Sequence, residues 1–273
     1  MRIVYVGAGN LATNLAQELN KQYFRIVQVY SRTIAAAEML ADRLGCPATN
    51  APSEIVSDAD LYIFSVTDDA LPGLLKQMPS NNGLWAHTAG SIPMSVFEPY
   101  SENFGVVYPF QTFSKSRKVD FRQIPFFIEA NTPDNLEKLR EMCSRLSSSV
   151  AELSSERRRI LHLTGVFACN FSNHLYTISK KLLDNANIPF DALLPLIDET
   201  AAKIHTLPPA AAQTGPAVRY DKKVIDGHLA MLYNSRWQDI YRLMSEDIYE
   251  TSKQMRNHEF DKLRFDENKM LHF

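Results

Sequence analysis

Residues 2–12 read RIVYVGAGNLA, a short apolar run of strand-forming residues that breaks into the pattern Gly-x-Gly-x-x-Ala. In this pattern the first glycine permits a tight turn, the second lets a pyrophosphate approach the backbone, and the alanine lets the next helix pack closely. The helix expected over 10–22 directs free N–H groups at its start toward the phosphates. Because a strand pattern precedes the turn and a helical one follows it, we interpret it as a dinucleotide site rather than an ordinary turn. The residues predicted to contact the cofactor are Gly7, Ala8, Gly9, Asn10 and Leu11.

The next strand pattern, over 25–30, ends in Ser31, Arg32 and Thr33, where a dinucleotide site usually selects its cofactor. An acidic residue at this place binds the ribose hydroxyls of NAD and repels the extra phosphate of NADP. A guanidinium and two hydroxyls can instead bind that phosphate, so the sequence predicts NADP(H). The alternative is that Ser31 and Thr33 cap the helix that begins near Ile34, with Arg32 a solvated charge, and the two roles are compatible.

Strand and helix patterns alternate up to residue 152, which is typical of a parallel sheet with helices on both faces. After that point the strand patterns stop and helical ones follow. We therefore predict an α/β protein, in which a Rossmann-type, doubly wound parallel sheet forms an NADP-binding domain (1–152) and a smaller all-α domain (153–273) serves substrate binding and dimerisation. The charged segment 257–273 is expected to be a final helix or an arm that reaches a neighbour. The expected strands are 2–6, 25–30, 61–66, 84–88, 105–108 and 125–130, and the expected helices are 10–22, 34–44, 70–77, 133–146, 155–185, 190–205 and 224–255.

Composition narrows the range of partners. The chain has 273 residues, of which 45% are hydrophobic, so it can bury a large core. A net charge of -2 gives no electrostatic argument for nucleic acid or an anionic membrane. No apolar run is long enough to span a membrane, and a strand that begins at residue 2 leaves no room for a signal peptide. Cys46, Cys143 and Cys169 have the spacing of neither a disulfide framework nor a metal site, which predicts a cytoplasmic protein without a metal.

Further candidate residues follow the strands, because open α/β sheets bind ligands at the carboxyl ends of their strands. The strand at 61–66 ends in Val66 and Thr67, which we expect beside the cofactor ribose. The sequence equally favours a structural role for this segment, in which Asp68 caps the helix that follows. The next strand ends in His87 and Thr88, which we expect to face the nicotinamide, although a single histidine is more often structural. A polar and aromatic turn over 108–112 (YPFQT) is expected nearby.

The first helix of the second domain carries polar groups along one side. His162, Asn170 and Asn173 share that side with Val166 and Cys169. Buried polar groups need partners, so the side faces either a neighbouring helix that satisfies them or a wet cleft between the domains. The sequence does not decide between these two interpretations.

The segment 208–221 reads PPAAAQTGPAVRYD, and its three prolines and glycine exclude a continuous helix. Asp221 is well placed to cap the next helix. Thr214 and Arg219 are the better candidates for binding an anionic substrate, because a guanidinium binds a carboxylate through two hydrogen bonds. So irregular a loop in a helical domain favours a functional role over a structural one.

Four segments together resemble a bacterial family of NADP oxidoreductases: GAGNLA (7–12), DLYIFSV (60–66), YPFQTF (108–113) and TGPAVRYD (214–221). In that family a Rossmann-like domain precedes a helical domain of unknown function. The resemblance covers nearly the whole chain and implies kinship with pyrroline-5-carboxylate reductase, ketopantoate reductase and the 3-hydroxyacid and phosphogluconate dehydrogenases. Those relatives transfer hydride between a nicotinamide and a small, often carboxylated substrate. They commonly dimerise through the helical domain, so the resemblance also implies a homodimer.

The chain departs from its relatives at two positions. In the hydroxyacid dehydrogenases a catalytic Lys precedes an Asn by one turn on the first helix of the second domain. The matching Asn here is Asn170, and the residue one turn earlier is Val166, so the usual lysine is absent. Tyr220 stands between Arg219 and Asp221, where the resemblance leads us to expect glycine.

The leading hypothesis is an NADPH-dependent reductase or dehydrogenase of a small polar imine, carbonyl or hydroxy acid compound bound between the domains. His162 would exchange the proton, because imidazole titrates near neutral pH. Asn170 would orient the substrate, and Thr214 and Arg219 would bind its anionic group. The missing lysine motivates the alternative of a non-catalytic NADP-binding sensor or interaction protein. A third hypothesis is a deazaflavin as hydride partner, since related dinucleotide domains use one.

Overall fold

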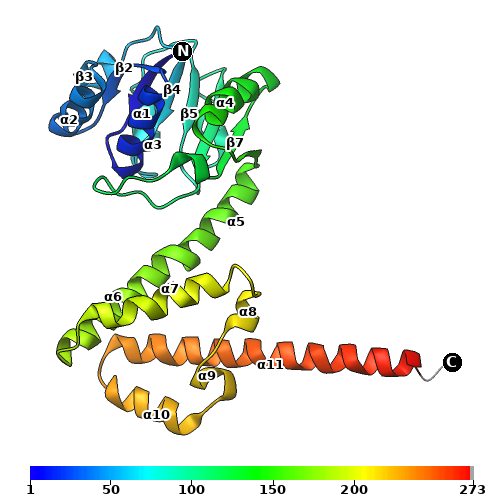
Figure 1. The fold of residues 1–273 in the computed structure, drawn as a ribbon. Helices are drawn as coiled ribbons and strands as arrows, with labels where there is room; N and C mark the ends of the chain where they lie inside the picture. Colours follow the sequence, from blue (N-terminus) through cyan, green and yellow to red (C-terminus); the bar gives the residue numbers. More distant parts are fainter. Residues whose placement is uncertain (271–273) are drawn as a thin grey trace. The chain divides into compact units, whose positions relative to one another are not determined.

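A computed structural model of the chain describes the secondary structure of residues 1–270 and the side chains of residues 1–256. It contains two compact units, one from Met1 to Ser172 and one that begins at Asn173. Figure 1 shows their elements in chain order. The sheet lies wholly in the first unit, and the described residues of the second unit form helices and connecting segments. The α/β class with a helical second part is therefore confirmed, whereas the functional division at residue 152 stays a prediction.

One sheet of eight strands organises the first unit, in the order β3-β2-β1-β4-β5-β6-β7-β8. Neighbouring strands are parallel except for β6 and β7, which are antiparallel. Only a short 3-10 turn, and no crossover helix, lies between these two strands, so the chain returns antiparallel. All six predicted strands are present, and the sequence missed β3 and β8 because they are only two and three residues long. The strands are β1 (Arg2–Val6), β2 (Arg25–Tyr30), β3 (Ala48–Thr49), β4 (Leu61–Phe64), β5 (Leu84–His87), β6 (Phe104–Pro109), β7 (Phe126–Ala130) and β8 (Val150–Glu152).

Both faces of the sheet are covered by apolar side chains. Along β1, Ile3 lies on one face and Val4 on the other, and both are fully buried. Helices α1, α2 and α4 pack against the face of Ile3, while α3 and an aromatic cluster around Trp85 and Phe97 pack against the face of Val4. This two-sided burial confirms the doubly wound architecture and explains why the strands are apolar throughout. The helices are α1 (Asn10–Lys21), α2 (Ile34–Leu44), α3 (Leu71–Leu75) and α4 (Pro133–Leu146).

Residues 155–185 are helical throughout, as predicted, but not uniformly α-helical. The stretch Val166–Phe171 is π-helical and separates α5 (Ser155–Gly165) from α6 (Ser172–Asn185). Such π-helical turns are rare and occur often at functional sites. Simple 3.6-residue spacing does not reveal one, so the sequence analysis missed it.

The remaining helices differ from prediction at two places. The stretch predicted as a helix over 190–205 begins with a 3-10 turn (Phe190–Leu193), and α7 (Leu194–Lys203) follows it. The predicted helix over 224–255 is divided into α10 (Lys222–Met231) and α11 (Arg236–Met270), because Asn234 adopts a left-handed conformation with φ 58°. The prediction of a single helix was wrong there. The tail expected as a helix or arm belongs to α11 as far as Met270, and residues 271–273 lie outside the described part. No helix in the described part of the chain is both long and apolar enough to cross a membrane.

The segment 208–221 is irregular, as its prolines predict. It holds two four-residue helices, α8 (Pro209–Ala212) and α9 (Pro216–Arg219), and α7 (Leu194–Lys203) precedes it. Asp221 accepts a hydrogen bond from the backbone N–H of Val224 at 3.4 Å, which confirms its capping role.

Tyr220, where the resemblance leads us to expect glycine, has a left-handed backbone with φ 52°. A left-handed conformation costs a residue other than glycine about 1 kcal/mol. The ring of Tyr220 packs against Tyr249 with a centroid distance of 4.8 Å. This contact offsets the cost, because aromatic pairs at such distances are favourable, and it allows tyrosine at a position that suits glycine.

Candidate functional site

The glycine turn after β1 has the geometry of a phosphate cradle. Gly7 has φ 124°, and its N–H donates to the carbonyl of Tyr30 at 2.7 Å. A side-chain carbon on Gly7 would lie 2.3 Å from the carbonyl oxygen of Ser65, so only glycine fits. At Gly9, by contrast, such a carbon would meet no atom within 4 Å. Gly9 is exposed immediately before α1 and therefore leaves open the space that a pyrophosphate needs at the start of the helix.

A cleft of about 660 Å³ extends from this turn across the ends of β1, β2 and β4. The cleft is lined by all three segments that the sequence predicted separately, 7–9, 31–33 and 66–67. It fits an NADP molecule because the open phosphate cradle and the Arg32 guanidinium line the same cleft. Asn50, which follows β3, also lines it and was missed because β3 is too short to recognise. Asn10 is exposed in the first turn of α1 but is not among the lining residues. The predicted residues that line the cleft are Gly7, Ala8, Gly9, Ser31, Arg32, Thr33, Val66 and Thr67.

The segment that was expected to select NADP is free to bind a phosphate. Thr33 occupies the position before α2, yet its side chain makes no capping hydrogen bond. Arg32 is exposed, and its charge lowers the pKa of Tyr30 against the larger effect of burial, which raises it. The capping alternative for this segment therefore lacks its hydrogen bond, and the guanidinium and the hydroxyl of Thr33 remain available to a ligand.

A second cleft, of about 410 Å³, lies in the same unit between β6, the turn after β5 and α5. Leu11 and Thr88 line it, and the Thr88 hydroxyl donates to Oγ of Ser65 at 3.0 Å. Ser65 in turn lines the cofactor cleft. The two clefts are therefore adjacent, and they share the boundary formed by Ser65 and Thr88.

His162 and Tyr108 meet in this second cleft. The Tyr108 hydroxyl lies 3.1 Å from Nδ1 of His162, and the two rings are nearly perpendicular with centroids 6.3 Å apart. Burial raises the pKa of Tyr108 to about 12, although the charge of Arg158 acts to lower it. The phenol is therefore neutral over the physiological range and can donate its proton in a hydrogen bond. Asn170 lines the same cleft from the π-helical stretch.

The environment of His162 bears on the question that the sequence left open. His162 and Asn170 are exposed and line this cleft of the first unit, whereas Asn173, on the same side of the helix, is not among the lining residues. Val166 lines the cleft as well, at the position where related dehydrogenases carry lysine. The ionisable side chains that line the cleft are those of Tyr108, His162 and Cys169, and the first two are in contact.

Two predicted residues have surroundings that differ from expectation. His87 is 1% exposed and packs against Phe97, and it lines neither cleft. Burial, and secondarily the charge of Arg158, lower its pKa to about 3, so it is neutral. Asp68 accepts a hydrogen bond from the Ser91 hydroxyl, and the residue that caps α3 is Ala70 rather than Asp68.

Thr214 and Arg219 belong to the second unit and are described there alone. Thr214 lines an apolar pocket of about 380 Å³ together with residues of α6, α10 and α11. Arg219 is exposed at the end of α9. Their role in substrate binding stays a prediction.

The sequence analysis missed three residues of the second cleft and its surroundings. Tyr108 was included only as part of a turn, and Glu129 and Arg158 were not singled out. Arg158 is fully buried and pairs with Glu129 at 2.7 Å. It lies in the run Arg157-Arg158-Arg159, which resembles a solvated charged segment, so no local pattern identifies it.

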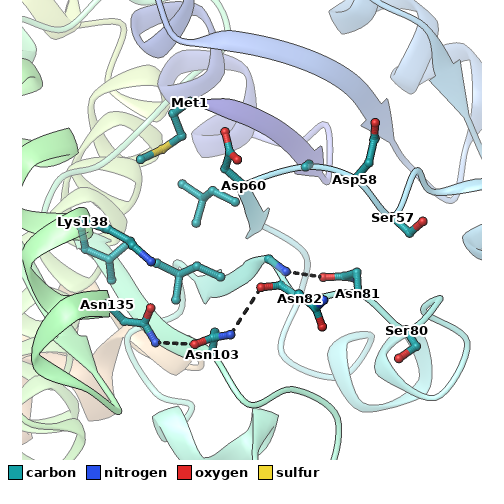
Figure 2. Close-up of a pocket in the computed structure, with 15 residues that line it drawn as sticks. Met1, Ser57, Asp58, Asp60, Ser80, Asn81, Asn82, Asn103, Asn135 and Lys138 are labelled. Atoms are coloured by element: carbon teal, nitrogen blue, oxygen red, sulfur yellow. Dashed lines mark hydrogen bonds between the residues drawn. The ribbon is translucent and has the colours of Figure 1, made fainter.

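A third cleft, of about 720 Å³, lies at the opposite edge of the sheet. Met1, Asp60 and Asn103 line it and precede β1, β4 and β6, whereas the cofactor cleft follows the strands. Figure 2 shows a chain of hydrogen bonds among its asparagines: the Asn135 side chain donates to the Asn103 side chain at 3.1 Å, and the Asn103 side chain donates to the backbone carbonyl of Asn82 at 3.3 Å. Ligands of such sheets bind at the carboxyl ends of the strands, and the other two clefts lie at that edge.

Comparison with known families and structures agrees with this geometry. Residues 2–87 match the family model "NADP oxidoreductase coenzyme F420-dependent", and residues 124–248 match a domain of unknown function, DUF2520. The crystal structure of a putative NADP oxidoreductase from Bacteroides fragilis is 50% identical, with a TM-score of 0.86 over 91% of this chain and 98% of that one. A search among curated proteins finds no significant match.

More distant structures share the fold. A protein from Thermotoga maritima is 19% identical, with a TM-score of 0.75 over 92% of this chain and 99% of that one. An imine reductase from Myxococcus stipitatus, in complex with NADP+, is 14% identical, with a TM-score of 0.61 over 94% of this chain and 95% of that one. With half of its residues identical to the Bacteroides fragilis protein over nearly the full length, the chain belongs to the family of NADP-dependent oxidoreductases in which an NADP oxidoreductase domain precedes a DUF2520 domain.

Proposed function

We propose that this oxidoreductase reduces a small polar imine or carbonyl compound, or oxidises the corresponding amine or hydroxy acid. The observation that carries the proposal is the Tyr108 and His162 pair, whose hydroxyl and Nδ1 are 3.1 Å apart in a cleft adjacent to the cofactor cleft. A proton-exchanging pair at this place is what hydride chemistry at a C=N or C=O bond requires.

The cofactor-binding residues follow from the first cleft. Gly9 and the start of α1 would hold the pyrophosphate, and Ser31, Arg32 and Thr33 would hold the 2′-phosphate. We leave His87 out of this site because it is buried away from both clefts. When bound, NADPH supplies the hydride.

The protein's contribution is the proton. Tyr108 keeps its proton at neutral pH. In our proposal its hydroxyl donates to Nδ1 of His162, and the imidazole proton is then on Nε2. In reduction, a carbon of the substrate gains the hydride while its nitrogen or oxygen takes the Nε2 proton of His162. Nδ1 of His162 takes the proton of the Tyr108 hydroxyl in the same step, and solvent then returns a proton to Tyr108. Asn170 would orient the polar group of the substrate, and Thr214 and Arg219 would bind its anionic part.

The test is turnover of NADPH with a panel of cyclic imines and keto acids, using wild type, His162→Gln and Arg219→Ala. We expect His162→Gln to lose most of kcat with the affinity for NADPH retained, and Arg219→Ala to raise KM for carboxylated substrates. Arg159→Ala, which changes an exposed polar side chain that lines neither cleft, is the matched control. Unchanged turnover in both variants on an identified substrate would refute the proposal, and the sensor alternative would then be favoured.

The description of the matching family model supports a second candidate hydride partner, a deazaflavin of the coenzyme F420 type. Such a partner would take hydride at a ring carbon and a proton from solvent at a ring nitrogen, so the step would need no proton from His162. Reduction of a deazaflavin by NADPH that is insensitive to His162→Gln, with no turnover of imines or keto acids, would favour this candidate over the first.

We further propose a homodimer formed through the helical unit. Met231, Tyr233 and Leu243 are 84%, 74% and 69% exposed, which is unusual for apolar side chains of this size in one helical unit. A second copy of the chain is the partner that the resemblance implies. Light scattering should give a dimer for wild type and for the control Gln254→Glu, and a monomer for Leu243→Glu. A monomeric wild type would contradict the proposal.

We also infer a cytoplasmic location from the state of the cysteines. Cys46, Cys143 and Cys169 are all free thiols, as expected in a reducing compartment. Fractionation of the native host, with the protein found outside the cytoplasm, would contradict the inference.

A further inference from the structure

Two contacts connect α5 to the sheet, Arg158 with Glu129 and His162 with Tyr108. The spacing between them is nearly the same on the helix as on the sheet. On the sheet, Glu129 of β7 pairs with Val106 of β6, and Tyr108 lies two residues further along β6, so the side chains of Glu129 and Tyr108 share one face. On the helix, Arg158 and His162 are four residues apart and share one side. Two residues of strand span about 6.6 Å and four residues of helix about 6 Å. Arg158 can therefore meet Glu129 while His162 meets Tyr108.

The contact of Arg158 is a buried network rather than a single ion pair. Its guanidinium donates to Glu129 at 2.7 Å, to the carbonyl of Ile92 at 2.6 Å and to Oγ of Ser155 at 3.1 Å. Glu129 also accepts hydrogen bonds from the N–H and the hydroxyl of Ser155, at 2.9 and 2.6 Å. The N–H of Met94 donates to the Ser155 hydroxyl at 2.9 Å. The network thus fixes the first turn of α5 to β7 and to the segment that follows β5.

The burial of this pair argues for a role beyond stability. The side chain of Arg158 is 1% exposed and that of Glu129 is 19% exposed. A buried ion pair costs so much desolvation that apolar residues of similar size often stabilise a protein as well or better. The guanidinium of Arg158 must bind a carboxylate and a backbone carbonyl at the same time. Because its N–H groups have a fixed geometry, this requirement restricts Arg158 to one position.

We infer that Arg158 and Glu129 are a positioning pair, which holds α5 at the one register where Nδ1 of His162 reaches the Tyr108 hydroxyl. The catalytic consequence of this inference rests on the proposed function, whereas its structural content does not. Neither residue touches the reacting atoms, so both act through His162. The charge of Arg158 has a second effect, because it opposes the rise of the Tyr108 pKa that burial causes.

The test is nitrogen NMR of the full-length chain with labelled histidine, without substrate. Tyr108→Phe defines the Nδ1 chemical shift of His162 without its hydrogen bond, and His162→Gln assigns the signal. We expect Arg158→Met to move the signal to the Tyr108→Phe value. Arg159→Met, an exposed arginine on the same helix, is the matched control and should keep the wild-type signal.

A double variant, Glu129→Met with Arg158→Met, removes both charges and leaves neither buried alone, so it is expected to fold even where the single variant does not. It too should give the Tyr108→Phe signal, and it should lower kcat at least tenfold with an unchanged Kd for NADPH. Arg158→Lys, which keeps the charge but not the fork, should restore the signal only in part. A folded double variant with the wild-type His162 signal would overturn the inference. A displaced signal in a protein that turns over no substrate would instead refute only the proposed function.

Discussion

The hydroxyl of Tyr108 lies 3.1 Å from Nδ1 of His162, although the two residues are 54 positions apart in the sequence. We expect Tyr108→Phe to lower kcat about tenfold or more, because the imidazole loses the group that fixes its tautomer. Since the pKa of Tyr108 is raised to about 12, the phenol stays protonated across neutral and mildly alkaline pH. The alkaline limb of the pH–rate profile should therefore be the same in wild type and Tyr108→Phe below about pH 11. An alkaline limb that disappears with the hydroxyl would contradict this assignment.

Gly90 packs against the ring of His162. A side-chain carbon at Gly90 would lie 2.6 Å from Nδ1 and Cγ and 2.8 Å from Cβ of His162. Because Cβ is fixed to the helix, Gly90→Ala must displace α5 or turn the ring away from Tyr108. We expect about a tenfold loss of kcat with an unchanged Kd for NADPH, measured by turnover and calorimetry.

The control for Gly90→Ala is Gly227→Ala, since a side-chain carbon at Gly227 would meet no atom within 4 Å. It should behave as wild type. Full activity in Gly90→Ala would show that the position of the His162 ring does not matter.

Alanine substitutions at the two glycines of the first turn should affect different properties, stability at Gly7 and NADPH binding at Gly9. Gly7→Ala places a carbon 2.3 Å from the Ser65 carbonyl at φ 124°, so we expect it to lower the free energy of unfolding by about 3 kcal/mol or more. Gly9→Ala meets no protein atom and should leave that free energy within about 0.5 kcal/mol of wild type, as at other sites without contacts. It should nevertheless weaken NADPH binding at least tenfold, because its methyl group occupies the phosphate cradle. Urea unfolding and calorimetry measure the two effects, and tight NADPH binding by Gly9→Ala would place the pyrophosphate elsewhere.

His87 makes the fold sensitive to acid. Its pKa is lowered from 6.5 to about 3, so the unfolded chain binds a proton that the folded chain does not over that range. Stability is therefore full above pH 6.5 and falls as the pH decreases toward 3, by at most about 1.4 kcal/mol per pH unit from this residue.

We expect His87→Phe to remove that part of the acid dependence, measured by urea unfolding between pH 7 and pH 4. His174→Phe, which replaces an exposed histidine, is the control and should keep the wild-type dependence. Parallel acid dependence in wild type and His87→Phe would argue that His87 is not the buried neutral group described here.

The sequence predicted the features that depend on residues close together in the chain. The glycine turn and Arg32 are determined by a few consecutive residues, and strands buried on both faces are apolar throughout, so both were found. The strands β3 and β8 are too short to show a pattern, and the interruption at Asn234 depends on the left-handed conformation of one residue.

Contacts between distant segments were beyond prediction. Tyr108 meets His162 only because α5 lies at one register on β6 and β7, and no spacing in the sequence encodes that register. Arg158 stands between two exposed arginines and differs from them only in the folded protein, where Glu129 pairs with it. Such contacts become visible once the strand register is known.

The most direct measurement of the central claim is a calorimetric titration of wild type and Arg32→Ala with NADPH and with NADH. If the first cleft holds NADPH with its 2′-phosphate on Ser31, Arg32 and Thr33, wild type binds NADPH more tightly than NADH. Arg32→Ala then loses about 10- to 100-fold in NADPH affinity, the value of a charged hydrogen-bonded pair, with NADH affinity unchanged. Equal binding of both nucleotides by both proteins, or binding of neither, would contradict the account.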